Sequence, residues 1–162
     1  MPSLFTVVSE YFWLVALGFA AFNYARARGS ITTSVPSDRA TDALTLLKWF
    51  AVIGNLPWVV MAVGKILGFT PTIWFYFRPQ DGNPFVVAWF AIAFAITCVY
   101  AYWVLFAGGA EKVRDLQPLA AVGRIGTQQQ SLRQIKLYAG VGPFFFIAWA
   151  ILVVSMNAPL AK

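Results

Sequence analysis

The sequence predicts an all-α polytopic membrane protein, a four-transmembrane-helix bundle whose second and fourth helices are kinked. Composition is the first observation. Hydrophobic residues make up 60% of the 162 residues and charged residues only 11%, whereas about a quarter of the residues in soluble domains are charged. A soluble protein of this size could not bury so much apolar surface. The second observation is that four segments are each long and apolar enough to cross a bilayer, which takes about 20 residues.

The first two predicted spans cover residues 4–25 and 46–67. Glu10 is the one acidic residue within a span, and it lies close enough to the outer surface to be hydrated or paired there with Lys65 or Arg78. An intramembrane carboxylate is also a candidate for proton or cation coupling. The second span carries Lys48 and Lys65 near its two ends, about 26 Å apart on a helix, so both ammonium groups can reach opposite membrane surfaces.

The middle of the second span contains Asn55 followed closely by Pro57. Proline has no N–H and its ring crowds the carbonyl four residues earlier, so we expect a kink at this point. The carbonyl of Ile53 and the amide of Asn55 then need partners within the membrane. Broken helices of this kind bind substrates or ions in transporters, but an ordinary packing kink with the amide bonded to a neighbouring helix gives the same sequence pattern.

The third predicted span, residues 85–107, carries no charge. Asn83 and Pro84 are suited to the N-cap and first turn of a helix, and Gly108 is suited to ending it. Small residues at helical spacing permit close helix packing, and this span has such a face, formed by Ala88, Ala91, Ala95 and Cys98.

The fourth predicted span, residues 137–156, is also uncharged. Thr127 and Gln130 have the spacing of a capping box, so the helix is expected to begin near residue 128, before it enters the lipid. Close to its cytoplasmic side we expect a second break, because proline removes a backbone donor and glycine lets helices approach. The residues concerned are Gly140, Gly142 and Pro143.

The distribution of Lys and Arg predicts the orientation. Nine of the twelve basic residues lie in or beside the connections 26–45 and 108–136, and such residues favour the cytoplasmic side. We therefore expect a single transmembrane domain in the inner membrane of a bacterium, with both termini on the periplasmic side. The basic connections would also attract anionic lipid headgroups. The net charge of +6 is then a signal of topology and does not indicate a nucleic-acid partner.

The remaining connection, residues 68–84, is expected on the outer side and is unusually aromatic. Its short apolar segment cannot span a bilayer, so it should lie at the interface, where Trp and Tyr are common. It could close the end of the bundle, dock a partner through its aromatic and Arg side chains, or form a cleft for a lipid or quinone headgroup. The candidate contact residues are Trp74, Phe75, Tyr76, Phe77 and Arg78.

The composition of the chain excludes several kinds of site. It has no histidine and one cysteine, Cys98, which rules out His-ligated haem and metals, acid–base relays through histidine, and a disulfide within the chain. We therefore expect no metal or other cofactor, although bound lipid is compatible with the sequence.

These features predict a non-catalytic membrane protein that works through helix–helix association, either as an accessory subunit of a membrane complex or as a homo-oligomer. The alternative is a small oligomeric transporter or channel that uses Glu10 and the kinked second helix. A third hypothesis is an enzyme that acts on lipid or quinone at the outer interface.

Overall fold

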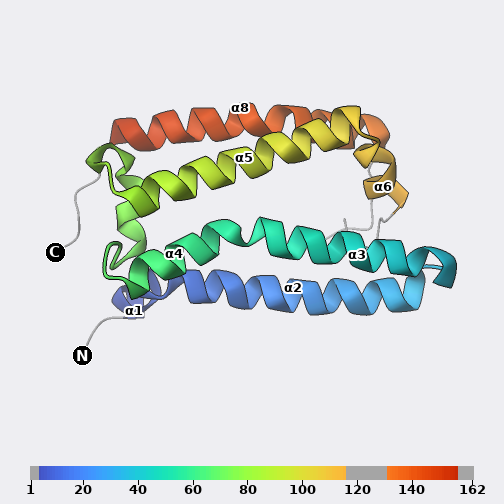
Figure 1. Ribbon diagram of the computed structural model, residues 1–162, viewed down its shortest axis with the longest axis horizontal. Coiled ribbons are helices and arrows are strands. Elements are labelled where there is room, and N and C mark those ends of the chain that lie inside the picture. Colours follow the sequence, from blue (N-terminus) through green and yellow to red (C-terminus); the bar gives the residue numbers. More distant parts are fainter. Residues whose placement is uncertain (1–3, 116–130, 157–162) are drawn as a thin grey trace.

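The structure, a computed structural model, describes residues 4–115 and 131–156, and its regular elements in these residues are all helices (Figure 1). The all-helical class is therefore confirmed. Three helical segments are long and apolar enough to cross a membrane, and a fourth is formed if α1 and α2 count as one bent span. The elements are α1 (Leu4–Glu10), α2 (Phe12–Ser34), α3 (Ser37–Gly54), α4 (Leu56–Ile66), η1 (Ile73–Phe77), η2 (Pro79–Asp81), α5 (Pro84–Phe106), α6 (Gly109–Asp115) and α8 (Leu132–Met156).

The long helices form two hairpins that meet at one end. In the first hairpin α2 packs against α3 and α4, and in the second α5 packs against α8. The hairpins touch mainly through α4 and α5, while α3 and α5 diverge towards the other end (Figure 1). The helices therefore lie in the order α8, α5, α3 with α4, and α2, with α2 and α8 at the two edges.

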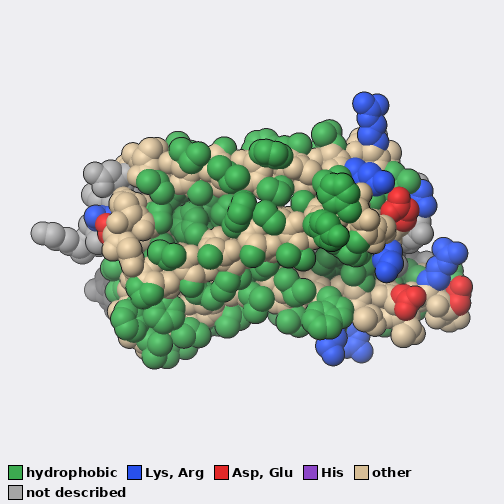
Figure 2. Space-filling view, turned by 45° about the horizontal axis from the view of Figure 1, so that its top comes forward, with side chains coloured by type: hydrophobic (Ala, Val, Ile, Leu, Met, Phe, Trp, Pro, Cys, Tyr) green, Lys and Arg blue, Asp and Glu red, His purple; other side chains and the backbone are tan. Residues whose placement is uncertain are grey.

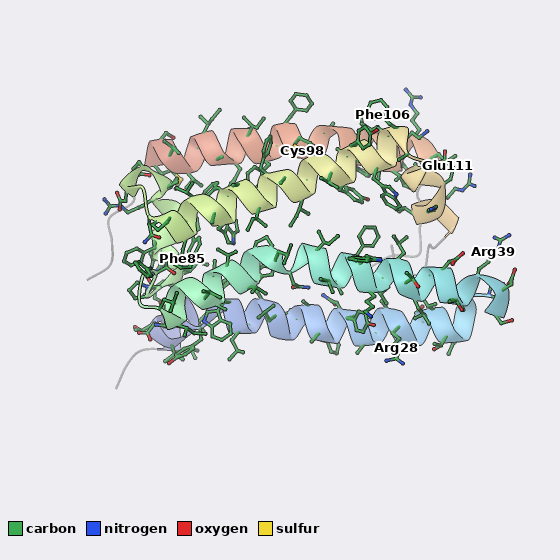
Figure 3. All side chains as sticks on the ribbon, in the orientation of Figure 1. Arg28, Arg39, Phe85, Cys98, Phe106 and Glu111 are labelled. Carbon is green, nitrogen blue, oxygen red and sulfur yellow. The ribbon has the colours of Figure 1, made fainter. Side chains whose placement is uncertain are left out.

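The two ends of the molecule differ in chemistry. Lys and Arg side chains gather at the end formed by the α2–α3 connection and α6 (Figure 2); we call this the basic end. Arg28, Arg39 and Glu111 lie there, whereas Phe85 lies at the opposite end, beside η1 and η2 (Figure 3). We call that end the aromatic end. The two basic connections thus share one end, as their charge predicts.

The first predicted span is not one straight helix. The chain leaves helical geometry at Tyr11, with φ −111° and ψ 22°, and α1 is bent by 73° from α2. α1 lies against η1, with the rings of Phe5 and Trp74 5.7 Å apart. Residues 4–10 therefore cover the aromatic end, and α2 extends nine residues past the predicted end at Ala25. No proline or glycine lies at this bend. It is set instead by contacts with η1 and α4.

The second predicted span is interrupted at Asn55, as the sequence indicates. α3 ends at Gly54 and α4 begins at Leu56. The side-chain Nδ2 of Asn55 donates to the carbonyl of Ala51 at 2.5 Å. Pro57 lies in the first turn of α4, where a missing N–H costs nothing because that turn has no helical acceptor.

The third span agrees closely with its prediction. α5 covers Pro84–Phe106, and the Asn83 side chain accepts a hydrogen bond from the backbone N–H of Phe85 at 3.0 Å. Gly108 has φ +72°, the left-handed conformation that follows many helices.

The fourth span differs from its prediction in two respects: it has no break at Pro143, and its helix begins at Leu132 and not near residue 128. α8 runs without interruption through Pro143, so the expected break is absent. Proline removes only one helical hydrogen bond, and the packing of α8 against α5 keeps the helix continuous. The helix is capped at Ser131, whose Oγ accepts from the N–H of Gln134 while the Gln134 side chain accepts from the N–H of Ser131. The capping box predicted at Thr127 and Gln130 lies outside the described residues.

Three groups of buried residues hold the helices together. One joins α2 to α3 near the basic end, around Ile31 and Leu47. A second joins α5, α6 and α8, around Val104 and Ile135. The third lies at the aromatic end, around Tyr76, and draws on α2, α4, η1 and α5. Only this third group includes residues of both hairpins, so it fixes how they meet.

The end of α4 packs closely against the chain that follows it. Gly68, with φ +79°, follows the helix, and the N–H groups of Gly68 and Phe69 bond to the carbonyls of Lys65 and Gly64, the Schellman pattern. The returning chain passes directly over Gly64. A Cβ at that position would collide with Thr70 Oγ1 and lie 3.2 Å from Phe85.

The substitution Gly64→Ala is therefore expected to lower the free energy of unfolding by about 1–3 kcal/mol, the usual effect of overpacking a tight contact. The matched control is Gly18→Ala in α2, because a Cβ at Gly18 has no neighbour within 4 Å. Denaturant titration in detergent micelles measures both variants. Equal stability of the two variants would contradict the close packing described for Gly64.

Candidate functional groove

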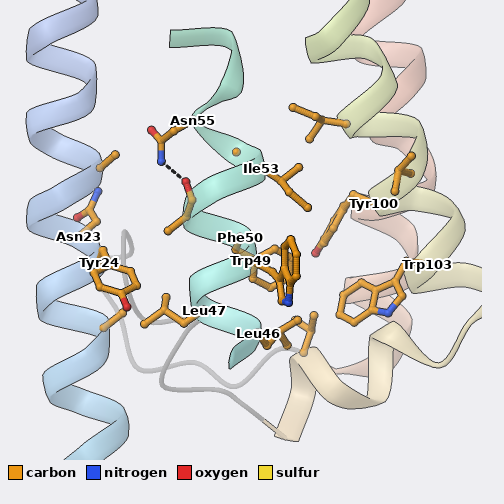
Figure 4. Close-up of a pocket in the computed structure, with 17 residues that line it drawn as sticks. Asn23, Tyr24, Leu46, Leu47, Trp49, Phe50, Ile53, Asn55, Tyr100 and Trp103 are labelled. Atoms are coloured by element: carbon orange, nitrogen blue, oxygen red, sulfur yellow. Dashed lines mark hydrogen bonds between the residues drawn. The ribbon is translucent and has the colours of Figure 1, made fainter. Parts of the chain in front are cut away.

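A groove of about 690 Å³ opens between the two hairpins, where α3 and α5 diverge (Figure 4). It begins near Asn55 and Ile96, in the middle of the helices, and reaches Val113 of α6 at the basic end. Its volume lies in the range of small-molecule sites, about 300–1,000 Å³. The groove exists because the buried group at the aromatic end holds α4 against α5, while no comparable contact closes α3 on α5.

Aromatic rings form much of the groove wall. The Phe50 ring of α3 lies 6.0 Å from the ring of Tyr100 and 5.8 Å from that of Trp103, both on α5. These edge-on contacts bridge the hairpins across the floor of the groove. Trp49 also lines it and is 59% exposed. The wall therefore offers flat, apolar surfaces to an occupant.

The groove also contains amide side chains from two helices. Asn23 of α2 and Asn55 at the α3–α4 break both line it (Figure 4). Asn55 uses its amide nitrogen to bond within its own helix, and no hydrogen bond of the Asn23 side chain is found within the described residues. Amides both donate and accept, so these groups can bind a polar atom that enters the groove. Asn23 is exposed and Asn55 is half-buried.

Glu10 lies elsewhere, at the aromatic end. Its Oε2 is 3.3 Å from Nζ of Lys65, which also donates to the carbonyl of Pro71 at 2.6 Å and lies 5.5 Å from the centre of the Tyr11 ring. The pairing with Lys65 agrees with the structural interpretation of Glu10. The structure does not bring Glu10 and Asn55 together.

The aromatic connection packs onto the end of the molecule. Trp74 contacts Phe77 with ring centres 5.8 Å apart, and Phe75 packs against the buried group there. Tyr76 is only 3% exposed and shares a 3.3 Å hydrogen bond with Thr70. Burial raises the pKa of Tyr76 above its ordinary value of 10.0, and the bond to Thr70 lowers it by less.

Arg78 completes this end by pairing with Asp81, with Nε–Oδ2 and Nη2–Oδ1 distances of 3.0 and 3.1 Å. The candidate residues of this connection therefore contact one another and the helix ends. They close the aromatic end, in agreement with the first of the three interpretations of this segment.

The small-residue face of α5 is only partly covered by the described residues. Ala91 and Ala95 are exposed, and Ala88 and Cys98 are half-buried. The glycines of α8 lie close to α5: a Cβ at Gly142 would lie 3.3 Å from Thr97, and one at Gly140 would lie 3.6 Å from Leu105.

Sequence reasoning found one groove residue, Asn55, and missed the aromatic wall. Trp49, Phe50, Tyr100 and Trp103 come from distant parts of the chain and meet only because of how the hairpins are arranged. The signal that could have found them is their position within one or two turns of the basic end of their predicted spans, where aromatic residues are common but seldom so many.

Comparisons of the chain with protein-family models, with curated proteins and with solved structures found no match. Within the described residues, no group of three or more His, Cys, Asp or Glu side chains could hold a metal ion. The groove is therefore interpreted from its own chemistry.

The contacts of Lys65 predict that Lys65→Met loosens α1 more than Glu10→Gln does. Lys65→Met removes the ion pair, the bond to Pro71 and the contact with Tyr11, whereas Glu10→Gln removes only the charge pairing, which is worth less than about 1 kcal/mol at a half-exposed site. Hydrogen exchange of the amides of residues 4–15 measures the effect, and we expect exchange about tenfold faster in Lys65→Met. The control is Lys48→Met; the same exchange rate in both lysine variants would contradict this role of Lys65.

Proposed function

We propose that the protein is a non-catalytic integral membrane protein that acts by association, holding another membrane constituent in the groove between its hairpins. The groove itself is the observation that carries the proposal. It is apolar, it lies within the part of the helices expected in the hydrocarbon, and its walls include Asn23 and Asn55. Within a bilayer such a groove is filled by lipid or by protein, since water does not enter an apolar cavity readily.

The polar groups of the groove support a binding role over a catalytic one. They are the amides of Asn23 and Asn55, the hydroxyls of Tyr24 and Tyr100, and the indole N–H groups of Trp49 and Trp103. None of these groups exchanges protons readily near neutral pH, whereas each can donate or accept a hydrogen bond. This set can orient a ligand, and the groove lining contains no carboxylate, imidazole or amine to act as a general acid or base.

The groove supports a location between the hairpins for the association expected from the sequence. The occupant of the groove could belong to a larger complex or to a second copy of the chain. The transporter hypothesis has less support, because Glu10 pairs with Lys65 and does not line the groove. The enzyme hypothesis has less support because Tyr76 is buried against Thr70 and Arg78 is paired with Asp81.

The proposed orientation places the basic end in the cytoplasm of a bacterium and the aromatic end in the periplasm, together with both termini. It is supported by the excess of Lys and Arg in the two connections of the basic end, which membrane insertion retains on the cytoplasmic side.

Photocrosslinking tests the groove directly. A benzophenone-bearing residue at Val99, which lines the groove and is 65% exposed, is expected to yield a discrete adduct in native membranes. The matched control is Val87, a 49% exposed valine on the same helix that does not line the groove. Mass spectrometry of the adducts separates a single lipid species, a second copy and a partner chain. The same broad mixture of lipid adducts at both positions would contradict the proposal.

A further inference from the structure

We propose that the groove binds an anionic phospholipid, with an acyl chain between α3 and α5 and the phosphate at the basic end. This inference rests on the proposed function and names the occupant of that groove. Three independent features of the groove support it: its length, its closed end and the charge around its mouth.

The length of the groove matches one leaflet of a bilayer. On the α3 side it extends from Asn55 to Leu46. Nine residues of helix rise about 14 Å, close to half of the roughly 30 Å hydrocarbon core. An acyl chain of a lipid in that leaflet covers the same depth.

The closed end of the groove distinguishes a lipid from a partner helix. A transmembrane helix runs through both leaflets and needs a contact surface along its whole length. Here the packing of α4 against α5 fills the space between the hairpins at the aromatic end, with Met61 and Val86 buried together. A spanning helix could not continue between the hairpins past this contact, whereas an acyl chain ends there.

Basic residues of three elements flank the mouth of the groove. The lining residues nearest the basic end are Ala27 of α2, Leu46 and Leu47 of α3 and Val113 of α6. Arg26 and Arg28 are adjacent in the chain to Ala27, Lys48 to Leu47, and Lys112 to Val113. Arg28 points away from α3 (Figure 3), and Lys48 also lines a second, smaller pocket beside α2. A phosphate at the basic end would therefore meet cations of both hairpins through their long, flexible side chains.

The acidic residues of this end do not cancel that charge. The two connections and their borders contain nine basic residues and four acidic ones. Of the acidic residues, Glu111 pairs with Lys136 at 3.6 Å and Asp38 with Arg39 at 4.0 Å, and neither partner is adjacent to a groove-lining residue. The excess of positive charge favours an anionic headgroup over a zwitterionic one.

The amides and hydroxyls fit the same occupant. Tyr24 and Asn23 line the groove between its mouth and its closed end, at the depth of the ester groups and the upper part of an acyl chain. Ester carbonyls accept hydrogen bonds, so the Asn23 amide and the Tyr24 hydroxyl can donate to them.

The test compares retention of phosphatidylglycerol with that of phosphatidylcholine. The full chain is reconstituted in nanodiscs containing equal amounts of the two lipids, released into the gas phase and weighed with its retained lipids. We expect retained phosphatidylglycerol on the wild type. The double variant Lys48→Gln with Lys112→Gln is expected to bind it about tenfold more weakly, because each basic residue near the surface contributes to binding.

The control is the double variant Arg39→Gln with Arg133→Gln, which removes the same charge from exposed residues of the basic end that do not flank the groove. Retention close to that of the wild type is expected. No preference for phosphatidylglycerol in the wild type, or an equal loss of that preference in both double variants, would overturn the inference. The basic residues would then attract anionic lipid in general and not at the groove.

A second pair of variants tests the apolar part. Gly54 lines the groove and a Cβ there has no neighbour within 4 Å, so Gly54→Leu should fill the groove and abolish retention. Gly18→Leu introduces the same side chain on α2, away from the groove, and should retain the lipid. Equal retention in the two variants would overturn the inference. A discrete polypeptide adduct at Val99 without lipid preference would overturn this inference alone, whereas no discrete adduct of any kind would remove the proposed function as well.

Discussion

The arrangement of the helices depends on one aromatic contact set centred on Trp89. Its ring lies 5.8 Å from those of Tyr76 and Trp149 and 6.2 Å from that of Trp58. These residues belong to η1, α8 and α4, so a single side chain of α5 connects both hairpins with the aromatic connection. Ring pairs of this kind stabilise beyond the area they bury. The hairpins consequently meet at the aromatic end, and their course towards the basic end follows from that contact.

The bilayer explains why the rest of the interface stays open. In water the hydrophobic effect favours the closing of an apolar groove. In a membrane the hydrocarbon is as apolar as the side chains, so helices associate only where they pack closely or form hydrogen bonds. Each hairpin has such a core near the basic end, around Leu47 in one and Val104 in the other. Among the ring contacts of the described residues, those of Phe50 with Tyr100 and Trp103 connect α3 to α5, and we propose that a membrane constituent fills the remaining space.

The sequence predicts those features that depend on local chemistry. The cap at Asn83 and the interruption at Asn55 are set by side chains within a few residues, and the structure has both. The bend at Tyr11 is missed because it depends on contacts with segments more than fifty residues away. The same distinction holds for the site: Asn55 is found from its own span, whereas Phe50 and Trp103 become groove residues only when two distant helices are placed side by side.

The central claim is that the Trp89 contact set, and not the wall of the groove, holds the two hairpins together. The free energy of unfolding of Trp89→Ala, compared with that of Trp49→Ala, tests this most directly. Both variants remove a tryptophan, but Trp49 is 59% exposed. We expect a loss of about 3 kcal/mol or more for Trp89→Ala and of less than about 1 kcal/mol for Trp49→Ala. Equal losses, or a larger loss at Trp49, would contradict the account.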